Sequence, residues 1–231
     1  MPSSIPNDIY QYSLWPAFAA GLDRGGPRVC DLINHGTYGV GVFEKSPESP
    51  PNGNGNGNGN GGGGSSGALP FATPPKEMVQ IEGKAYSIAY DGTVEAAEPR
   101  ANLPYAMVSV FQPTQRVELR SSFTFDDLRK VAWPNSPTSF RITGAFRSVH
   151  TKQGLYEEAE GTIFGFMIPR WQAAVSGDEY SQMRFIDDDR KQGGGSVLGF
   201  EAGEGALLES GGCGRFHLGF PQDEKFNQLK F

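Results

Sequence analysis

The sequence predicts an α+β fold in which antiparallel β-sheet dominates and helices are few and short. Three observations lead to this prediction. The chain of 231 residues contains roughly ten short segments of strand character, separated by Gly, Pro, Asn and Asp. Few segments, all of them short, have the pattern of a helix. Aromatic residues make up 12% of the chain and include 16 Phe, which suffices for a core although hydrophobic residues total only 37%.

Hydrophobic periodicity and turn residues place the elements along the chain. The predicted helices span residues 14–22, 29–34, 125–132 and 223–229. The predicted strands span residues 38–43, 78–81, 85–90, 94–96, 105–111, 140–143, 145–150, 161–168, 180–186, 196–201 and 215–219. Gly21 and Gly36 stand where the first two helices should end. Gly83 and Gly92 each follow an acidic residue in a turn signal, so residues 78–96 are predicted to form a meander.

The chain is predicted to be a single domain, residues 1–231, either undivided or split into two β lobes, 1–135 and 136–231. Thr124 and Asp127 have the spacing of a capping box and should start the third helix, which ends before Pro134. Residues 45–76 form an insertion of Asn-Gly repeats flanked by prolines. Its repeats offer no apolar side chains to offset the entropy of ordering, so we predict that the insertion is disordered.

The composition excludes several classes of partner and site. The chain carries 20 Lys and Arg against 26 Asp and Glu, a net charge of −6, so we expect no nucleic-acid partner. It has neither a signal-peptide pattern nor a run of about 20 apolar residues, so we expect a cytoplasmic protein without a membrane partner. The three histidines, His35, His150 and His217, lack metal-ligand spacing. These patterns alone name no activity.

Six segments occur in the order and spacing of a known family. They are I-Y-Q-Y-S (9–13), L-I-N-H-G-T-Y-G-V-G-V-F (32–43), E-M-V-Q-I-E-G-K-A-Y with Y-D-G-T-V (77–86 and 90–94), F-R-I-T-G-A-F (140–146), G-T-I-F-G-F-M-I-P (161–169), and F-I-D-D-D-R with G-G-G (185–190 and 193–195). Their order and spacing agree from about Tyr10 to Phe226, so the match spans nearly the whole chain apart from the insertion. On these segments the chain resembles the acetolactate decarboxylase family.

The resemblance implies a fold, an activity and a metal. The implied fold is mostly antiparallel or mixed sheet with a small β-barrel. The implied reaction is the decarboxylation of 2-acetolactate to acetoin. In the family, a zinc ion held by three histidines acts as a Lewis acid on the enolate that forms when CO2 leaves. Two of these histidines form an H-x-H on a strand, and the third follows a Gly-rich turn.

This chain departs from the family pattern at all three ligand positions. The H-x-H falls on Gln182 and Arg184, and the third histidine falls on Ser196. An amide, a guanidinium and a hydroxyl do not replace imidazoles around Zn²⁺, and Arg184 would repel the ion. We therefore expect no metal and no cofactor. The chain between Val149 and Gly161 is also shorter than the family pattern, which has a loop there near the mouth of the site.

Two functional groups of the family remain. Glu77 matches an acidic residue and Arg141 matches an arginine that contacts substrate, so these two are the predicted catalytic residues. Gln182, Arg184 and Ser196 are predicted to line the inherited pocket and to bind a small anionic substrate. Arg184 keeps positive charge where an enolate or carboxylate would lie. In the plainer alternative, Glu77 and Arg184 form an ion pair that only fills the space of the lost metal.

Three functions stay open on the sequence. The first is a metal-independent enzyme that decarboxylates, isomerises or cyclises an anionic oxo acid or a polyketide-like molecule. The second is a catalytically inactive protein that binds a small anion or a protein partner. The third is a genuine acetolactate decarboxylase, which the missing zinc ligands disfavour. The resemblance also implies that a sheet edge can pair in a homodimer, although the sequence does not fix the oligomeric state.

Overall fold

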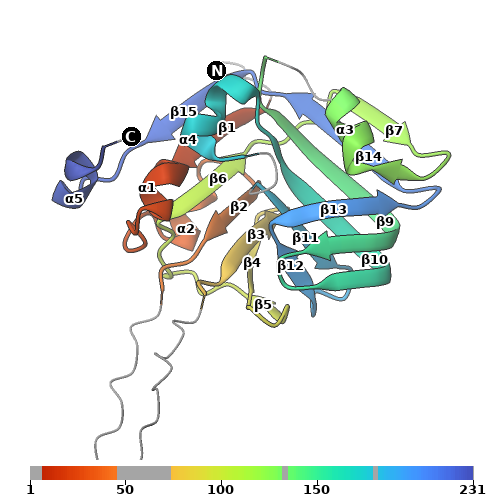
Figure 1. Ribbon diagram of the computed structural model, residues 1–231, viewed down its shortest axis with the longest axis horizontal. Coiled ribbons are helices and arrows are strands. Elements are labelled where there is room, and N and C mark those ends of the chain that lie inside the picture. The colour runs from red at the N-terminus through yellow and green to blue at the C-terminus, as the bar shows by residue number, and fades with distance from the viewer. Residues whose placement is uncertain (1–6, 46–73, 132–134, 179–181, 231) are drawn as a thin grey trace, which may run out of the picture.

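The computed structural model describes residues 7–45, 74–131, 135–178 and 182–230, and it is built mainly of strands (Figure 1). The strands are β1 (Asp8–Tyr12), β2 (Tyr38–Val42), β3 (Glu77–Ile81), β4 (Lys84–Ile88), β5 (Val94–Ala96), β6 (Tyr105–Ser109), β7 (Gln115–Glu118), β8 (Phe123–Thr124), β9 (Thr138–Thr151), β10 (Leu155–Met167), β11 (Met183–Asp187), β12 (Gly193–Gly195), β13 (Val197–Ala202), β14 (Leu207–Gly212) and β15 (Arg215–Gly219). The predicted α+β class is therefore confirmed. Residues 46–73, most of the predicted insertion at 45–76, lie outside the described residues.

The helices are few and short, as predicted. They are α1 (Trp15–Ala19), α2 (Val29–Leu32), α3 (Phe125–Val131), the 3-10 helix η1 (Arg170–Gln172), α4 (Ala173–Ser176) and α5 (Glu224–Gln228). The backbone N–H and the hydroxyl of Thr124 both donate to Asp127, over 3.1 and 2.9 Å, which fixes the start of α3. None of the described helices has the length and apolar character needed to cross a membrane.

The first sheet has seven strands in the order β15-β1-β6-β2-β3-β4-β5. Strands β3, β4 and β5 pair as consecutive antiparallel neighbours, which is the meander predicted for residues 78–96. Strands β1 and β15 instead pair in parallel, with a register that runs from Asp8 opposite Arg215 to Tyr12 opposite Gly219. A strand from each end of the described chain therefore meets at one edge of this sheet.

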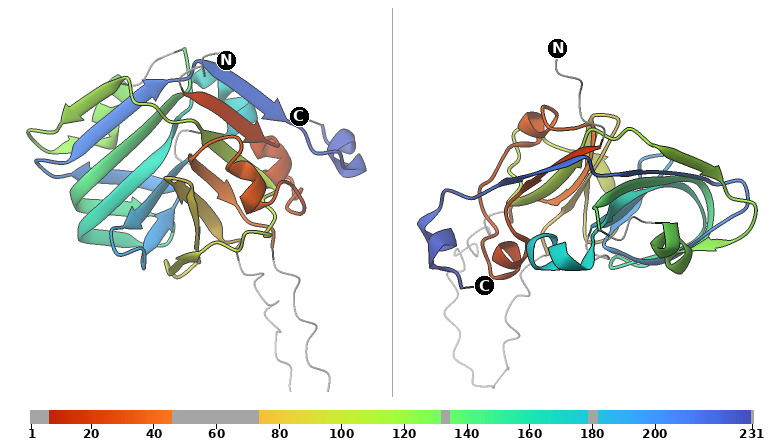
Figure 2. Two further views of the ribbon diagram at one scale, coloured as in Figure 1. Left: turned by 180° about the vertical axis from the view of Figure 1, so that it is seen from behind. Right: turned by 90° about the horizontal axis from the view of Figure 1, so that it is seen from above.

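The second sheet has the order β12-β11-β10-β9-β13-β8, and β14 lies beside β9 with β7 on its other side. Its longest strands, β9 with 14 residues and β10 with 13, form a hairpin. The sheet curls around its own concave side, which α3 covers (Figure 2). No pairing joins the outer strands within the described residues. The predicted small β-barrel is therefore wrong, because the sheet curls without closing.

Two of the three hydrophobic clusters of the described residues lie on the two faces of the second sheet. One lies between the sheets and includes Val40 and Val79 of the first sheet and Phe164 of the second. The other fills the concave side of the second sheet and includes Phe185 of β11 and Leu128 of α3. Successive side chains of a strand point to opposite faces, so β10 and β11 each supply residues to both clusters.

One row of residues across the second sheet positions the charged side chains. The register pairs Arg141 of β9 with Phe164 of β10, and Phe164 with Arg184 of β11. Directly opposed residues share one face of a sheet, so both arginines point the same way on either side of Phe164. The rings of Phe164 and Tyr38, from the first sheet, have centroids 5.2 Å apart. Both arginines therefore lie in the interface between the sheets.

One strand boundary differs from the prediction at a glycine. Residues 140–143 and 145–150 belong to a single strand, β9, which Gly144 continues with a φ of +128°. A Cβ at Gly144 would lie 3.1 Å from the Cα of Ala206, so this position needs glycine for the close approach as well as for its φ. Glycine therefore marks an irregularity inside this strand and not its end.

Candidate functional site

The centre of the candidate site is an ion pair between Glu77 and Arg184. Nε of Arg184 lies 2.6 Å from Oε2 of Glu77. The side chain of Arg184 is fully buried, whereas 12% of the side chain of Glu77 is exposed. Nη1 of Arg184 also donates to the carbonyl of Met183 over 2.9 Å. The pair therefore joins β11 of the second sheet to β3 of the first, with its carboxylate on the more accessible side.

The backbone of β12 makes room for this carboxylate. Gly195 is the register partner of Arg184 and ends the run of glycines that forms β12. A Cβ at Gly195 would overlap the carboxyl carbon and both oxygens of Glu77, so the ion pair requires glycine there. The next residue, Ser196, is buried and has a φ of +47°, a left-handed conformation that is uncommon for a residue with a Cβ.

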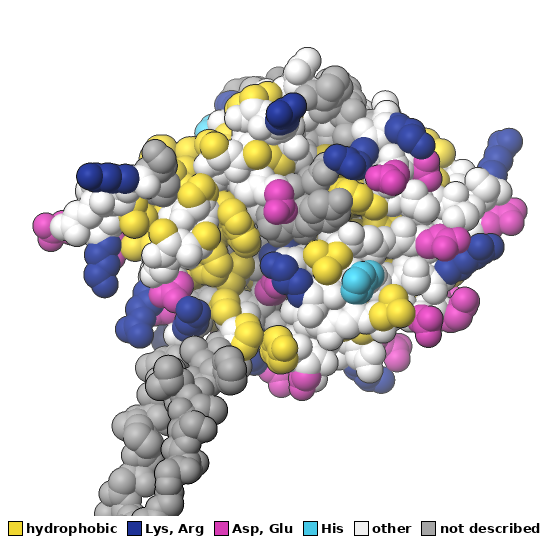
Figure 3. Space-filling model, viewed as in Figure 1, with side chains coloured by type: hydrophobic (Ala, Val, Ile, Leu, Met, Phe, Trp, Pro, Cys, Tyr) yellow, Lys and Arg dark blue, Asp and Glu magenta, His cyan; other side chains and the backbone are white. Residues whose placement is uncertain are grey.

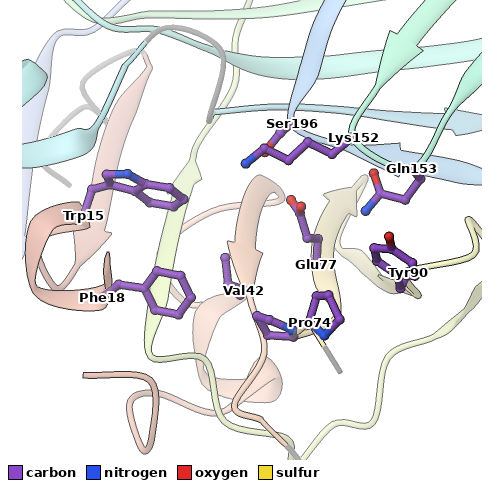
Figure 4. Close-up of a pocket in the computed structure, with 10 residues that line it drawn as sticks. Trp15, Phe18, Val42, Pro74, Glu77, Tyr90, Lys152, Gln153 and Ser196 are labelled. Atoms are coloured by element: carbon purple, nitrogen blue, oxygen red, sulfur yellow. The ribbon is translucent and has the colours of Figure 1, made fainter. Parts of the chain in front are cut away.

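A pocket of about 450 Å³ lies beside this ion pair. Its lining residues are Trp15, Phe18, Val42, Pro74, Pro75, Glu77, Tyr90, Lys152, Gln153 and Ser196 (Figure 4). Of these described residues, Glu77 is the only acid and Lys152 the only cation. Figure 4 shows the carboxylate of Glu77 pointing toward the polar side of the pocket, which Lys152, Gln153 and Ser196 form. The pocket thus combines one carboxylate and one amine with a wall of aromatic and proline side chains.

The structure does not bring all five predicted site residues together. Glu77 and Ser196 line the pocket, and Arg184 lies behind Glu77. Arg141 and Gln182 do not belong to the pocket wall. The ion pair between Glu77 and Arg184, which the plainer structural alternative also expects, is present.

Gln182 takes part in a buried polar network. Its Nε2 donates to the carbonyl of Ser176 over 2.5 Å, and the hydroxyl of Tyr105 donates to the same carbonyl over 3.0 Å. Oγ of Ser176 donates to Oε1 of Gln11 over 2.5 Å. Burial raises the pKa of the Tyr105 phenol, so its hydroxyl remains a donor. This network ties α4 to β1 and β6 and holds the amide of Gln182 to Ser176, and neither residue is among those that line the pocket.

Arg141 belongs to a second ion pair. Its Nε donates to Oε2 of Glu209 over 2.8 Å, and Nε of Arg116 donates to Oε1 over 2.9 Å. Nη1 of Arg141 donates to the hydroxyl of Tyr38 over 2.5 Å and lies 3.5 Å from Oε1 of Glu82. Burial alone would raise the pKa of the Glu209 carboxyl, but hydrogen bonds and charge from Arg141 and Arg116 outweigh it and lower this pKa below its ordinary value. Arg141 is therefore bound to Glu209 and Tyr38, away from the pocket.

Sequence reasoning misses the side chains that complete the pocket wall. Lys152 and Gln153 lie in the turn between β9 and β10, where the resemblance implies a longer loop. Oε1 of Gln153 accepts from the backbone N–H of Gly195 over 2.9 Å, which holds this turn against β12. Trp15 and Phe18 are three residues apart in α1, so they share a helix face. That spacing is a signal for the aromatic pair, whereas only the shortened loop points to Lys152.

The residues at this site do not fit the zinc ion that the family resemblance implies. At two of the positions where the resemblance places zinc ligands, Arg184 sets a guanidinium against Glu77, and Gln182 directs its amide to Ser176. Zn²⁺ needs imidazole, thiolate or carboxylate donors, and a neighbouring guanidinium would repel it. In the described part of the chain, no three His, Cys, Asp or Glu side chains gather in a group that could hold a metal ion.

Comparison with known proteins identifies the family. The profile of the family "Alpha-acetolactate decarboxylase" matches residues 64–154 and 150–231. The chain is 25% identical to the alpha-acetolactate decarboxylase of Klebsiella aerogenes over 252 aligned positions, which cover 98% of this chain and 84% of the relative. It is 27% identical to that of Streptococcus thermophilus over 251 positions, which cover 96% of this chain and 92% of the relative.

Solved structures agree with this result at the level of fold. The crystal structure of acetolactate decarboxylase from Bacillus subtilis subspecies spizizenii superposes with a TM-score of 0.77 at 18% identity, over 96% of this chain and 94% of that chain. A Staphylococcus aureus protein of unknown function, similar to alpha-acetolactate decarboxylase, superposes with a TM-score of 0.76 at 20% identity, over 97% and 94%. The chain belongs to the alpha-acetolactate decarboxylase family.

Proposed function

We propose that this chain is a metal-independent enzyme that acts on a small anionic oxo acid through an enolate. The observation that carries the proposal is the ion pair of Glu77 and Arg184 at the wall of a pocket. It sets a carboxylate and a cation where the family resemblance implies metal chemistry. Membership of the family supports a carbon–carbon lyase, or an isomerase or cyclase derived from one.

Glu77 is the group placed to move a proton. Its carboxylate faces the pocket, and Arg184 holds it from behind. A carboxylate can take a proton from a carbon beside a carbonyl, and the electron pair of that bond then moves onto the carbonyl oxygen as an enolate. Return of the proton to a different atom completes an isomerisation. In a cyclisation, the enolate carbon attacks a second carbonyl of the same molecule, and the alkoxide that results takes the proton back from Glu77.

Decarboxylation of a 3-oxo acid passes through an enolate of the same kind. The bond between the carboxylate carbon and its neighbour breaks, CO2 leaves, and the electron pair again moves onto the carbonyl oxygen. Lys152 and Ser196 stand on the polar wall, where an ammonium and a hydroxyl would stabilise that oxygen. The enolate carbon then takes up a proton. The three reactions therefore share one requirement, the stabilisation of an enolate beside Glu77.

A second candidate is a protein that binds a small anion without turning it over. Arg184 is fully buried, and its ion pair with Glu77 bridges the two sheets, a role that needs no catalysis. A genuine acetolactate decarboxylase is the third candidate. The names of the relatives favour it, and the side chains at the ligand positions disfavour it.

The test follows the chemistry of the enolate directly. The purified full chain is incubated in D2O with pyruvate, acetoacetate or racemic 2-acetolactate, and NMR follows deuterium exchange, loss of CO2 and acetoin. Metal content is measured on the same sample. We expect exchange or CO2 release above background with far less than one zinc per chain. Acetoin formation with near-stoichiometric zinc would establish the third candidate, and binding without any reaction would establish the second.

Two variants separate catalysis from structure. Glu77→Gln removes the proton acceptor and leaves Arg184 without its counter-charge, so activity and stability should both fall. Adding Arg184→Met removes both charges and should restore most of the stability. The rate should stay about 100- to 10,000-fold low, as expected for the loss of a general base. Recovery of activity together with stability would contradict the proposal. Glu157→Gln, at an exposed acid of β10, is the matched control and should preserve both.

A further inference from the structure

The pocket is larger and more aromatic than a three- or four-carbon oxo acid requires. Its volume of about 450 Å³ lies within the range of about 300–1,000 Å³ in which proteins bury drug-sized ligands. Trp15 and Phe18 form one side of it, and Tyr90 stands on the other side of Glu77 (Figure 4). A molecule the size of pyruvate bound at Glu77 would leave these rings in water.

The rings on the α1 side are held in place without a ligand. The ring of Trp15 meets that of Tyr105 edge-on with centroids 5.1 Å apart, and it contacts Phe18 at 5.6 Å. Tyr105 is fully buried and is fixed by its hydrogen bond to Ser176. An aromatic wall that is already ordered loses little conformational entropy when it receives a flat apolar group.

The surface beside the pocket extends this apolar side. Figure 3 shows hydrophobic side chains gathered over α1, on the face that carries the pocket. Val42 lies between Phe18 and Glu77 in Figure 4, and Pro74 and Pro75 add further apolar lining. A hydrophobic patch that leads into a pocket is typical of a site for an apolar part of a ligand.

The polar side of the pocket indicates which chemical groups the polar end of a ligand would carry. The charge of Arg184 is engaged by Glu77, so Lys152 is the cation that faces a ligand. Its neighbour Gln153 is anchored to the backbone of Gly195, which fixes the turn that carries Lys152. Ser196 adds a hydroxyl on the same side. An ammonium and a hydroxyl beside one carboxylate suit a head group that carries a carboxylate and a carbonyl.

We propose that the ligand of this pocket is an oxo acid with an aromatic body, whose ring packs against Trp15 and Phe18 and whose anionic head binds Lys152 and Ser196. This inference rests on the proposed function and names its substrate class. The polar and aromatic sides flank Glu77. An acid of this shape therefore places the carbon between its ring and its carbonyl next to the carboxylate of Glu77. That carbon is the one that loses a proton when such an acid enolises.

The test compares three probes by titration calorimetry on the full chain: phenylpyruvate, pyruvate, which lacks the ring, and 3-phenylpropanol, which lacks the acid. We expect phenylpyruvate to bind at least about tenfold more tightly than either, a difference of about 1.4 kcal/mol. Trp15→Leu should weaken phenylpyruvate about tenfold and leave pyruvate unchanged, and Phe18→Leu should act in the same direction. Lys152→Gln should weaken both acids and leave 3-phenylpropanol unchanged.

The controls are Trp171→Leu, at an exposed tryptophan outside the pocket, and Lys84→Gln, at an exposed lysine of β4, and both should bind like the parent. Equal affinities for phenylpyruvate and pyruvate, or no effect of both ring variants, would overturn the inference. Deuterium exchange on the same samples separates the two proposals. Tight binding of phenylpyruvate without exchange would keep the inference and overturn the enzymatic function. Deuterium exchange on pyruvate, with no preference for phenylpyruvate in binding, would keep the enzymatic function and overturn the inference.

Discussion

Two arginine–glutamate pairs lie in the same sheet interface, on either side of Phe164, and they differ in what surrounds the acid. Glu209 has a fully buried side chain and is held by Arg141 and Arg116. Glu77 meets one arginine, Arg184, and keeps 12% of its side chain exposed. The order of burial within the two pairs is therefore reversed. The arginine is the more buried partner in the pair at the pocket, and the glutamate is the more buried partner in the other pair.

This reversal separates a structural pair from one that can reach a ligand. A carboxylate locked between two guanidinium groups has its lone pairs engaged and no route to a ligand. A carboxylate pressed from behind by one guanidinium still presents a face to the pocket. The residue type alone does not tell the two cases apart, since each pair consists of an arginine and a glutamate. One pair joins neighbouring strands of one sheet, and the other joins the two sheets.

The largest effects should come from removing the acid of either pair. Glu77→Gln leaves the fully buried Arg184 without its counter-charge, and breaking a buried pair from one side costs about 3 kcal/mol or more. Glu209→Gln should cost less, about 2 kcal/mol, because Arg141 is 19% exposed and still has Glu82 at 3.5 Å. Urea unfolding should show both losses. A reversed ranking would mean that the burial of the remaining arginine does not set the cost of breaking a pair.

The pH dependence of stability should change in the Glu209→Gln variant. The folded-state pKa of Glu209 lies below its ordinary value of 4.5, so its ionised form stabilises the fold above that pH. This contribution is lost as the pH falls from about 4.5 through the folded-state pKa. The difference in unfolding free energy between the parent and Glu209→Gln should therefore shrink between pH 6 and pH 3. A constant difference would show that the charge of Glu209 is not what stabilises the pair.

A smaller effect should come from the hydroxyl that supports Arg141. Tyr38→Phe keeps the ring contacts with Phe164 and Phe111 but removes the acceptor that Arg141 uses at 2.5 Å. We expect a loss of about 0.5–1.5 kcal/mol in unfolding free energy. Binding at the pocket should not change, because Tyr38 is not among the residues that line it. A change in ligand affinity would show that the two pairs are coupled across Phe164.

The smallest effect should come from relieving backbone strain at the pocket. Ser196 has a φ of +47°, and so does Glu158, an exposed residue of β10 outside the pocket wall. Replacing either by glycine should raise the unfolding free energy by about 0.5 kcal/mol, since the cost of the left-handed conformation slightly exceeds the entropy cost of glycine. Only Ser196→Gly should also weaken the binding of an oxo acid. Equal binding of the oxo acid by both variants would show that the Ser196 hydroxyl does not contact the ligand.

The fold was largely predictable because most strands alternate or end at turn residues, and the exceptions have physical causes. β14 was not predicted because residues 208–211 are all buried, so period-two alternation is absent. β1 was not predicted because its buried residues include Gln11, a polar side chain that the network around Ser176 satisfies. The second ion pair was also not predictable, because its acid, Glu209, lies on β14.

The candidate site was predictable only where the family pattern carried a residue into it. Glu77 is the first residue of β3 and Ser196 directly follows β12, and both strands belong to the segments that carry the resemblance. Lys152 reaches the pocket through the length of one hairpin turn, and Trp15 through the docking of a helix, and both depend on tertiary packing. Nothing in the local sequence around Arg141 indicates that Glu209 binds it.

The parallel pairing of β1 with β15 has a mechanical consequence. The start of β1 and the end of β15 lie at opposite ends of this pair, because the two strands run in the same direction. A force that pulls these two points apart therefore slides one strand along the other and loads all the hydrogen bonds between them at once. Antiparallel neighbours such as β3 and β4 would instead be peeled apart one bond at a time from their open end. The seam between the two ends of the described chain is thus the part of the first sheet best arranged to resist stretching.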